Sequence, residues 1–130
     1  MLSAAERAFL ENPFVGVVTD LRPDGSPHST VVWVDVDDDG VSFNTAWPRA
    51  KPRYLEEDPR VSLAVLDPHD PYRWIAIAGT TTLVDEGAND QIDRLSEKYT
   101  GRERYASHRE GETRVSVRIS PTRVESRGID

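Results

Sequence analysis

The sequence has 130 residues, no cysteine and a formal net charge of -7. This length suits about one domain, and the lack of cysteine excludes disulfides and thiolate metal ligands. The acidic charge argues against nucleic-acid partners, which need a basic surface, and the absence of a signal-peptide pattern or of a ~18-residue apolar run predicts a cytoplasmic protein with no membrane span.

The N-terminal part of the chain predicts one helix followed by hairpins. Ser3 and Glu6 form a capping-box pattern, which predicts a short helix from Ala4 to Glu11. Two turn sequences, Arg22–Gly25 and Asp37–Gly40, separate segments rich in β-branched residues. We therefore expect a meander of three consecutive antiparallel strands, at residues 14–21, 31–36 and 41–45.

The C-terminal part alternates strands with two helices. Apolar periodicity predicts helices at residues 50–58 and 89–99, and strands at 61–66, 73–85 and 113–124. Gly79 lies inside a long strand and predicts a bulge or bend. In the last strand apolar residues alternate with Arg114, Ser116 and Arg118, so we expect these three polar side chains to face solvent. Strands that come first as hairpins, with helices in the later connections, predict a closed or half-closed antiparallel barrel.

The start of the helix at residues 50–58 carries charges of unexpected sign. Helix N-termini have free N–H groups and partial positive charge, so they attract acidic residues. This one instead gathers Arg49, Lys51 and Arg53, at a cost of roughly 0.3–1 kcal/mol for each exposed charge. A bound phosphate would reverse that penalty, and Asn44 and Thr45 at the end of the preceding strand add side-chain donors.

Two interpretations of these cations remain open at this point. They bind a phosphate-bearing cofactor, or they pair with Glu56, Glu57 and nearby aspartates on a solvated face. The histidines are too scattered for a metal motif, so no metal site is expected.

Three tryptophans complete the candidates. Trp33 and Trp47 are expected in the core, which is the usual place for such side chains. Trp74 follows a proline-rich loop beside Tyr72 and Arg73. This group could wall a flat conjugated ring or form a subunit contact.

Several short motifs, taken in order, resemble the pyridoxamine 5'-phosphate oxidase-like FMN-binding split-barrel superfamily. They are Arg22-Pro23-Asp24-Gly25-Ser26-Pro27-His28, Val32-Trp33-Val34, Phe43-Asn44-Thr45, Arg49-Ala50-Lys51, Asp58-Pro59-Arg60-Val61-Ser62 and Asp67-Pro68. Together they are similar to its flavin/deazaflavin oxidoreductase branch, which uses coenzyme F420. The resemblance covers Glu6 to Val124. It implies a mainly β fold, an antiparallel six-stranded split β-barrel with short peripheral helices, in a single cofactor-binding domain over residues 1–130.

The resemblance also implies a homodimer with a cofactor at the subunit interface. In the family, the segment that matches Asn44–Lys51 holds the cofactor phosphate, residues that match His28–Val32 run beside the ring, and the loop that matches Tyr72–Trp74 comes from the second subunit. The cofactor-binding residues expected on this basis are His28, Ser29, Thr30, Val31, Val32, Asn44, Thr45, Arg49, Ala50, Lys51, Tyr72, Arg73 and Trp74.

The function implied is that of an oxidoreductase. Reduced F420 would transfer hydride to small electron-poor conjugated molecules such as quinones or lactones, with no catalytic side chain required. The alternatives are an FMN-dependent oxidoreductase on the same fold and a non-catalytic flavin- or deazaflavin-binding protein. F420 differs from FMN in its acidic tail, for which Arg53 and Arg60 are the candidate contacts.

Overall fold

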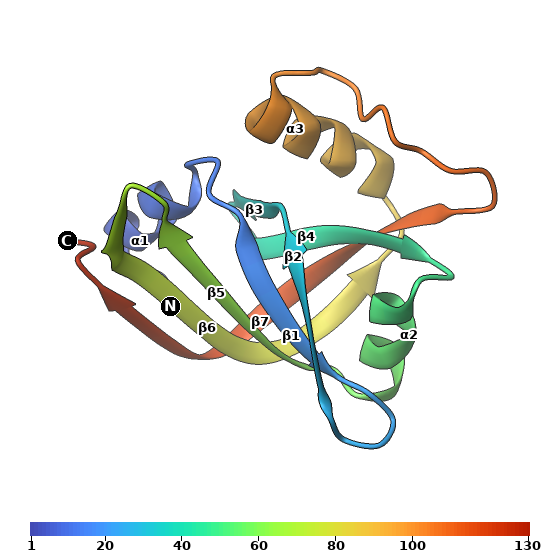
Figure 1. Ribbon diagram of the computed structural model, residues 1–130, viewed down its shortest axis with the longest axis horizontal. Helices are drawn as coiled ribbons and strands as arrows, with labels where there is room; N and C mark the ends of the chain where they lie inside the picture. Colours follow the sequence, from blue (N-terminus) through green and yellow to red (C-terminus); the bar gives the residue numbers. More distant parts are fainter.

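The computed structural model describes residues 1–130 as one curled antiparallel sheet with three helices at its margins (Figure 1). In chain order the elements are α1 (Ala4–Leu10), β1 (Gly16–Leu21), β2 (Pro27–Val32), β3 (Val34–Asp37), β4 (Gly40–Trp47), α2 (Ala50–Glu57), β5 (Arg60–Asp67), β6 (Asp70–Val84), α3 (Ala88–Thr100) and β7 (Thr113–Arg127). The strands hydrogen-bond in the order β2-β1-β5-β6-β7-β4-β3. The expected mainly β, antiparallel barrel with peripheral helices is confirmed, with seven strands in place of six.

The additional strand arises at Trp33, where the prediction of one strand over residues 31–36 is wrong. The chain breaks there into β2, which pairs with β1, and β3, which pairs with β4. These two strands are consecutive in the chain, yet they form the opposite edges of the sheet. The sheet therefore curls until its edges meet at Trp33, which makes a barrel. The expected three-stranded meander is replaced by two separate hairpins.

The interior of the barrel is apolar, and α1 packs against it. The cluster of buried side chains includes Phe43, Leu63, Ile75 and Ile77, all fully buried. Figure 1 shows α1 at one end of the barrel and α2 at the other. The predicted capping box of α1 is confirmed, because the Ser3 hydroxyl accepts from the Glu6 amide and the Glu6 carboxylate accepts from the Ser3 amide.

The predicted bend at Gly79 is confirmed by an irregularity in the β6–β7 ladder. The register shifts between Ala78 and Gly79, so that Gly79 lies opposite Pro121. A Cβ on Gly79 would lie 2.1 Å from the Ser120 carbonyl oxygen. Only glycine permits this close backbone approach, which lets the 15-residue β6 pair with both β5 and β7.

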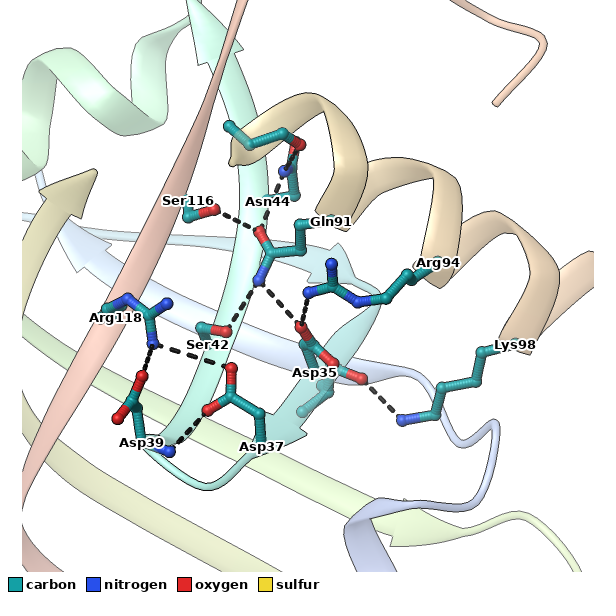
Figure 2. Close-up of polar contacts among 12 residues, drawn as sticks. Asp35, Asp37, Asp39, Ser42, Asn44, Gln91, Arg94, Lys98, Ser116 and Arg118 are labelled. Atoms are coloured by element: carbon teal, nitrogen blue, oxygen red, sulfur yellow. Dashed lines mark hydrogen bonds and ion pairs between the residues drawn. The ribbon is translucent and has the colours of Figure 1, made fainter. Parts of the chain in front are cut away.

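Helix α3 covers the polar face of β7, and this overturns part of the expectation for that strand. Arg114 and Ser116 are only 6% and 4% exposed, whereas they were expected to face solvent. Arg118 alone stays partly exposed, and it lies 3.8 Å from Asp37 and 3.7 Å from Asp39 (Figure 2). Strand alternation separates two faces of a strand, but it cannot say that a distant helix covers the polar one.

Candidate functional site

The cleft of the molecule lies where the barrel is split. Strand β3 pairs with β4 only over Gly40–Phe43, so Asn44–Trp47 of β4 has a neighbour, β7, on one side alone. Strand β2 likewise pairs with β1 only. A cleft of about 290 Å³ lies against these two free edges. Its lining residues are Val31, Val32, Trp33, Asn44, Thr45, Arg49, Lys51, Ile92, Leu95, Tyr105, Ser107 and Arg114.

The cleft brings together about half of the residues predicted from the sequence. Val31, Val32, Asn44, Thr45, Arg49 and Lys51 line it. Thr30 adjoins this group, because Lys51 Nζ donates to its hydroxyl at 3.1 Å. The remaining predicted residues, His28, Ser29, Ala50, Tyr72, Arg73 and Trp74, do not line this cleft.

The predicted group at the start of β6 lies near α1, away from the cleft. The guanidinium carbon of Arg73 is 5.2 Å from the centroid of the Phe9 ring in α1, and Arg73 also pairs with Asp67 at 2.7 Å. Tyr72 is 77% exposed. Tyr72–Trp74 therefore cannot complete the cleft of the chain to which they belong.

The start of α2 has the charge pattern expected from the sequence. Arg49 is the N-cap residue, and the first turn contains no acidic residue and no side-chain cap. Arg49 donates to Glu112 through Nη2 at 2.8 Å and through Nε as well, an interaction that raises the pKa of Arg49. Neither Glu56 nor Glu57 forms an ion pair, so the alternative interpretation, in which these two residues pair with the cations, is wrong.

Lys51 is the second cation of the cleft, and it has no carboxylate within ion-pair distance. Burial lowers the pKa of Lys51, an effect opposed by the charge of Asp20 and reinforced by Arg49. A half-buried ammonium with only a hydroxyl partner retains unused donors. Lys51 is thus available to an anion that enters the cleft.

Arg114 is a third cation of the cleft, and the sequence analysis missed it. Its Nη1 donates to Asn44 Oδ1 at 3.2 Å, and its guanidinium carbon lies 4.7 Å from the Tyr105 ring centroid. Its Nη2 is buried without a partner, and so is the hydroxyl of Thr45. Unpaired buried polar atoms are uncommon and costly, and both residues line the cleft, so a ligand there can contribute an acceptor to Arg114.

The side chain of Asn44 hydrogen-bonds mainly to other residues of the protein, which leaves little of it for a ligand in the cleft. Its amide nitrogen donates to the Ala88 carbonyl at 2.8 Å and to Gln91 Oε1 at 3.0 Å. Gln91 in turn accepts from Ser116 and donates to Ser42, which fixes the network beneath α3 (Figure 2). With both amide hydrogens used, Asn44 contributes its carbonyl oxygen, which orients Arg114.

Aromatic side chains form an apolar wall of the cleft. Trp33 was expected in the core, but it lies at the break between β2 and β3 and lines the cleft. Its ring stacks on Tyr99 at 5.5 Å, and Tyr105 meets it edge-on at 6.0 Å. The lining of the cleft therefore combines cations with flat aromatic side chains. Such a combination suits a ligand with a phosphate and a planar ring.

Asp20 is a further buried charge near Lys51 that the sequence analysis missed. It is 1% exposed and lies opposite His28 in the β1–β2 ladder, with Oδ1 2.8 Å from His28 Nδ1. The His28 ring packs edge-on against Tyr54 of α2 at 5.4 Å. His28 is therefore held inside the barrel wall by Asp20 and α2.

The fold and the cleft together define a split β-barrel protein. The chain belongs to the pyridoxamine 5'-phosphate oxidase family, whose model matches residues 2–128. No curated protein sequence is significantly similar to it. None of its helices is long and apolar enough to cross a membrane.

Solved structures with the same fold extend this comparison. A protein described as an F420 reductase is 25% identical, with a TM-score of 0.80 over 96% of this chain and 98% of that one. A conserved hypothetical protein from Mycobacterium tuberculosis is 28% identical, with a TM-score of 0.75 over 98% and 85%. The heme storage protein HutZ from Vibrio cholerae is 14% identical, with a TM-score of 0.69 over 95% and 92%, a likeness of fold alone.

Proposed function

We propose that this chain is an oxidoreductase that uses reduced coenzyme F420 to transfer hydride to small electron-poor conjugated molecules, quinone- or lactone-like. The observation that carries the proposal is the cleft itself, where Arg49, Lys51 and Arg114 adjoin an apolar wall that includes Trp33 and Tyr105. The similarity to an F420 reductase over almost the full length of both chains supports it. We place the enzyme in the cytoplasm, in a single cofactor-binding domain.

The residues present fit the phosphate of such a cofactor. Three cations line the cleft, and Glu112 is the only carboxylate paired with any of them. The unpartnered Arg114 Nη2 needs an acceptor, which the oxygens of a phosphate supply. Arg49 and Lys51 would hold this group, with Ala50 offering a backbone N–H in the first turn of α2.

A bound deazaflavin would supply the hydride, and the protein would contribute binding and orientation. Val31, Val32 and Trp33 line one edge of the cleft. The free edge of β2 beside the cleft offers backbone groups, among them those of His28, Ser29 and Thr30, to a planar ring. Apolar walls would exclude water from the reacting atoms and so limit side reactions of a reduced cofactor.

An exposed apolar row on the sheet supports a homodimer. Val31, Val17 and Ala64 are cross-strand neighbours on the outer face of β2, β1 and β5, and all three are exposed. Leu66, 49% exposed, pairs with Trp74 in a neighbouring position. Isolated exposed apolar residues are ordinary, but a contiguous row marks an interaction surface.

This row also explains how a second copy would complete the site. Val31 belongs both to the row and to the lining of the cleft, so a partner that covers the row borders the cleft. A volume of about 290 Å³ lies at the lower limit of ligand sites, which span roughly 300–1,000 Å³. We infer that Tyr72, Arg73 and Trp74 of a second copy supply the remaining wall.

FMN is the second candidate cofactor, and one contact favours it. F420 has an acidic tail that would need cations beyond Lys51. Arg60 is engaged by Asp58, with Nε–Oδ1 at 3.0 Å and Nη2–Oδ2 at 2.8 Å, which leaves Arg53 for the tail. The tail contact is therefore weaker than the sequence suggested, and the phosphate contact serves either cofactor.

A fluorescence titration with F420 and with FMN tests the proposal. The wild type should bind at least one of them, and the double variant Arg49→Ala, Lys51→Ala should lose most of that affinity. Arg118→Ala is the matched control, because Arg118 is on β7 and does not line the cleft. Binding of neither cofactor, or an unaffected double variant, would contradict the proposal. Binding without oxidation of reduced F420 by any quinone would indicate a binding protein in place of an enzyme.

A further inference from the structure

The Arg49–Glu112 ion pair joins the start of α2 to the segment that precedes β7. The Glu112 carboxylate receives two guanidinium donors from Arg49, one to each oxygen. This forked geometry is the one by which arginine recognises a carboxylate or a phosphate. Glu112 is 13% exposed, so the pair is partly removed from solvent.

Arg114 lies in the same part of the cleft and lacks such a partner. Its side chain is buried, and no carboxylate lies within 4.0 Å of it. A buried cation without a counter-charge is costly, and here the guanidinium is nonetheless held in place by Asn44 and Tyr105. A charge that is fixed but unneutralised is typical of a binding site.

The carboxylate of Glu112 lies within the influence of both guanidinium groups. Arg49 lowers the pKa of Glu112 most, and the positive charges of Arg114 and Arg109 lower it further. An anion at the position of this carboxylate is therefore attracted by Arg49 and Arg114 together. Tyr105, which covers the Arg114 guanidinium, belongs to the same connection between α3 and β7 as Glu112.

We propose that Arg114 is a phosphate-binding residue and that Glu112 is an internal competitor for its site. A phosphate group takes the place of the Glu112 carboxylate on Arg49 and gains Arg114 as a further donor. The identity of the phosphate-bearing ligand rests on the proposed function. The displacement of Glu112 by a phosphate does not depend on which molecule carries that phosphate.

Charge explains why a phosphate displaces the carboxylate. A phosphate monoester carries about -1.5 to -2 at neutral pH and has three acceptor oxygens, whereas a carboxylate has one charge and two oxygens. Any anion that binds Arg49 must first displace Glu112. A carboxylate of a substrate or metabolite gains nothing by replacing another carboxylate, whereas a phosphate does, so Glu112 favours phosphate over carboxylate ligands.

Titration of the full chain with inorganic phosphate, followed by NMR, tests the exchange directly. Glu112→Gln removes the competitor and keeps the shape, so phosphate affinity should rise about tenfold. Arg114→Gln should lower it by about the same factor, and Arg114→Lys should restore part of the loss. Arg118→Gln, on the same strand, is the matched control and should leave affinity unchanged. If Glu112→Gln leaves phosphate affinity unchanged or weakens it, Glu112 is a structural residue and the proposal is wrong.

Matched ligand pairs separate this inference from the proposed function. FMN and riboflavin differ by the phosphate, as do F420 and its phosphate-free chromophore. Arg114→Gln should weaken FMN or F420 binding and leave the phosphate-free partner unaffected; equal weakening of both would overturn the role of Arg114. Failure of the wild type to bind any of the four ligands would contradict the proposed function, while the phosphate titration would still decide the exchange. Thermal unfolding of each variant confirms that the protein is folded.

Discussion

Asp20 and His28 face each other across the β1–β2 ladder, with Asp20 Oδ1 2.8 Å from His28 Nδ1. The same carboxylate is the charge that opposes the lowering of the Lys51 pKa by burial. The buried wall of the barrel thus stabilises the cation of the candidate phosphate site. This pair and other contacts of the fold can each be tested with a single substitution.

Asp20→Ala should destabilise the protein by about 1–3 kcal/mol. The substitution removes the partner of His28 and leaves its ring nitrogen unsatisfied inside the barrel. Urea unfolding followed by circular dichroism measures the loss. Asp38→Ala, at an exposed position, is the matched control and should change stability by less than about 0.5 kcal/mol. Equal effects of the two variants would argue against a structural role for the Asp20–His28 pair.

Cofactor affinity should fall at alkaline pH as Lys51 loses its proton. Burial lowers the pKa of Lys51 from its ordinary value of 10.5, so the loss of the charge that attracts phosphate begins at lower pH than for an exposed lysine. Lys51→Arg keeps the charge at all these pH values, and its affinity should stay constant where that of the wild type declines. Dissociation constants from about pH 7 to 10 measure this; parallel profiles of the two proteins would refute it.

Lys98 should make the free energy of unfolding rise with pH in the alkaline range. Its ammonium donates to the carbonyls of Leu10 and Val34, and burial lowers its pKa to about 8. Between that pKa and the ordinary value of 10.5 the unfolded chain holds more protons than the folded protein. The stability of the wild type relative to Lys98→Met should therefore rise with pH across this interval. Chemical unfolding of both proteins at several pH values gives this difference, and a flat or falling difference would count against it.

Gly79→Ala should prevent stable folding or lower stability by more than about 3 kcal/mol. The added Cβ would lie 2.1 Å from the Ser120 carbonyl oxygen, so β6 and β7 would have to separate. Thr80→Ala, at the next and exposed position, is the control and should be nearly neutral. The midpoint of thermal unfolding compares the two. A Gly79→Ala protein as stable as the wild type would show that the bend tolerates a side chain.

Val17→Glu should produce a folded monomer with weakened cofactor binding. Val17 lies in the apolar row with Val31 and Ala64, and a buried unpaired carboxylate there is costly. Thr82→Glu introduces the same charge at an exposed position of β6 and serves as the control. Light scattering gives the molecular mass of each variant. A wild type that is itself monomeric would contradict the proposed interface.

Local patterns determined much of this protein from the sequence alone. The α1 capping box, the left-handed Gly25 and the cation-rich start of α2 all depend on residues a few positions apart. So does the amphipathic face of α3, which ends at a left-handed Gly101. Such features are decided by backbone preferences and hydrophobic periodicity. They were sufficient to predict a mainly β barrel and the cations Arg49 and Lys51.

The tertiary structure alone decided the partners of these residues. Arg49 meets Glu112 across 63 positions of the chain, and Arg114 meets Asn44 across 70. The break at Trp33 follows from the pairing of its two sides with different strands, and Arg114 is buried because α3 docks over β7. No local pattern encodes these contacts, because they depend on which distant segments the closing barrel brings together. The sequence therefore determined where positive charge gathers, and the fold decided which cations remain free to bind a ligand.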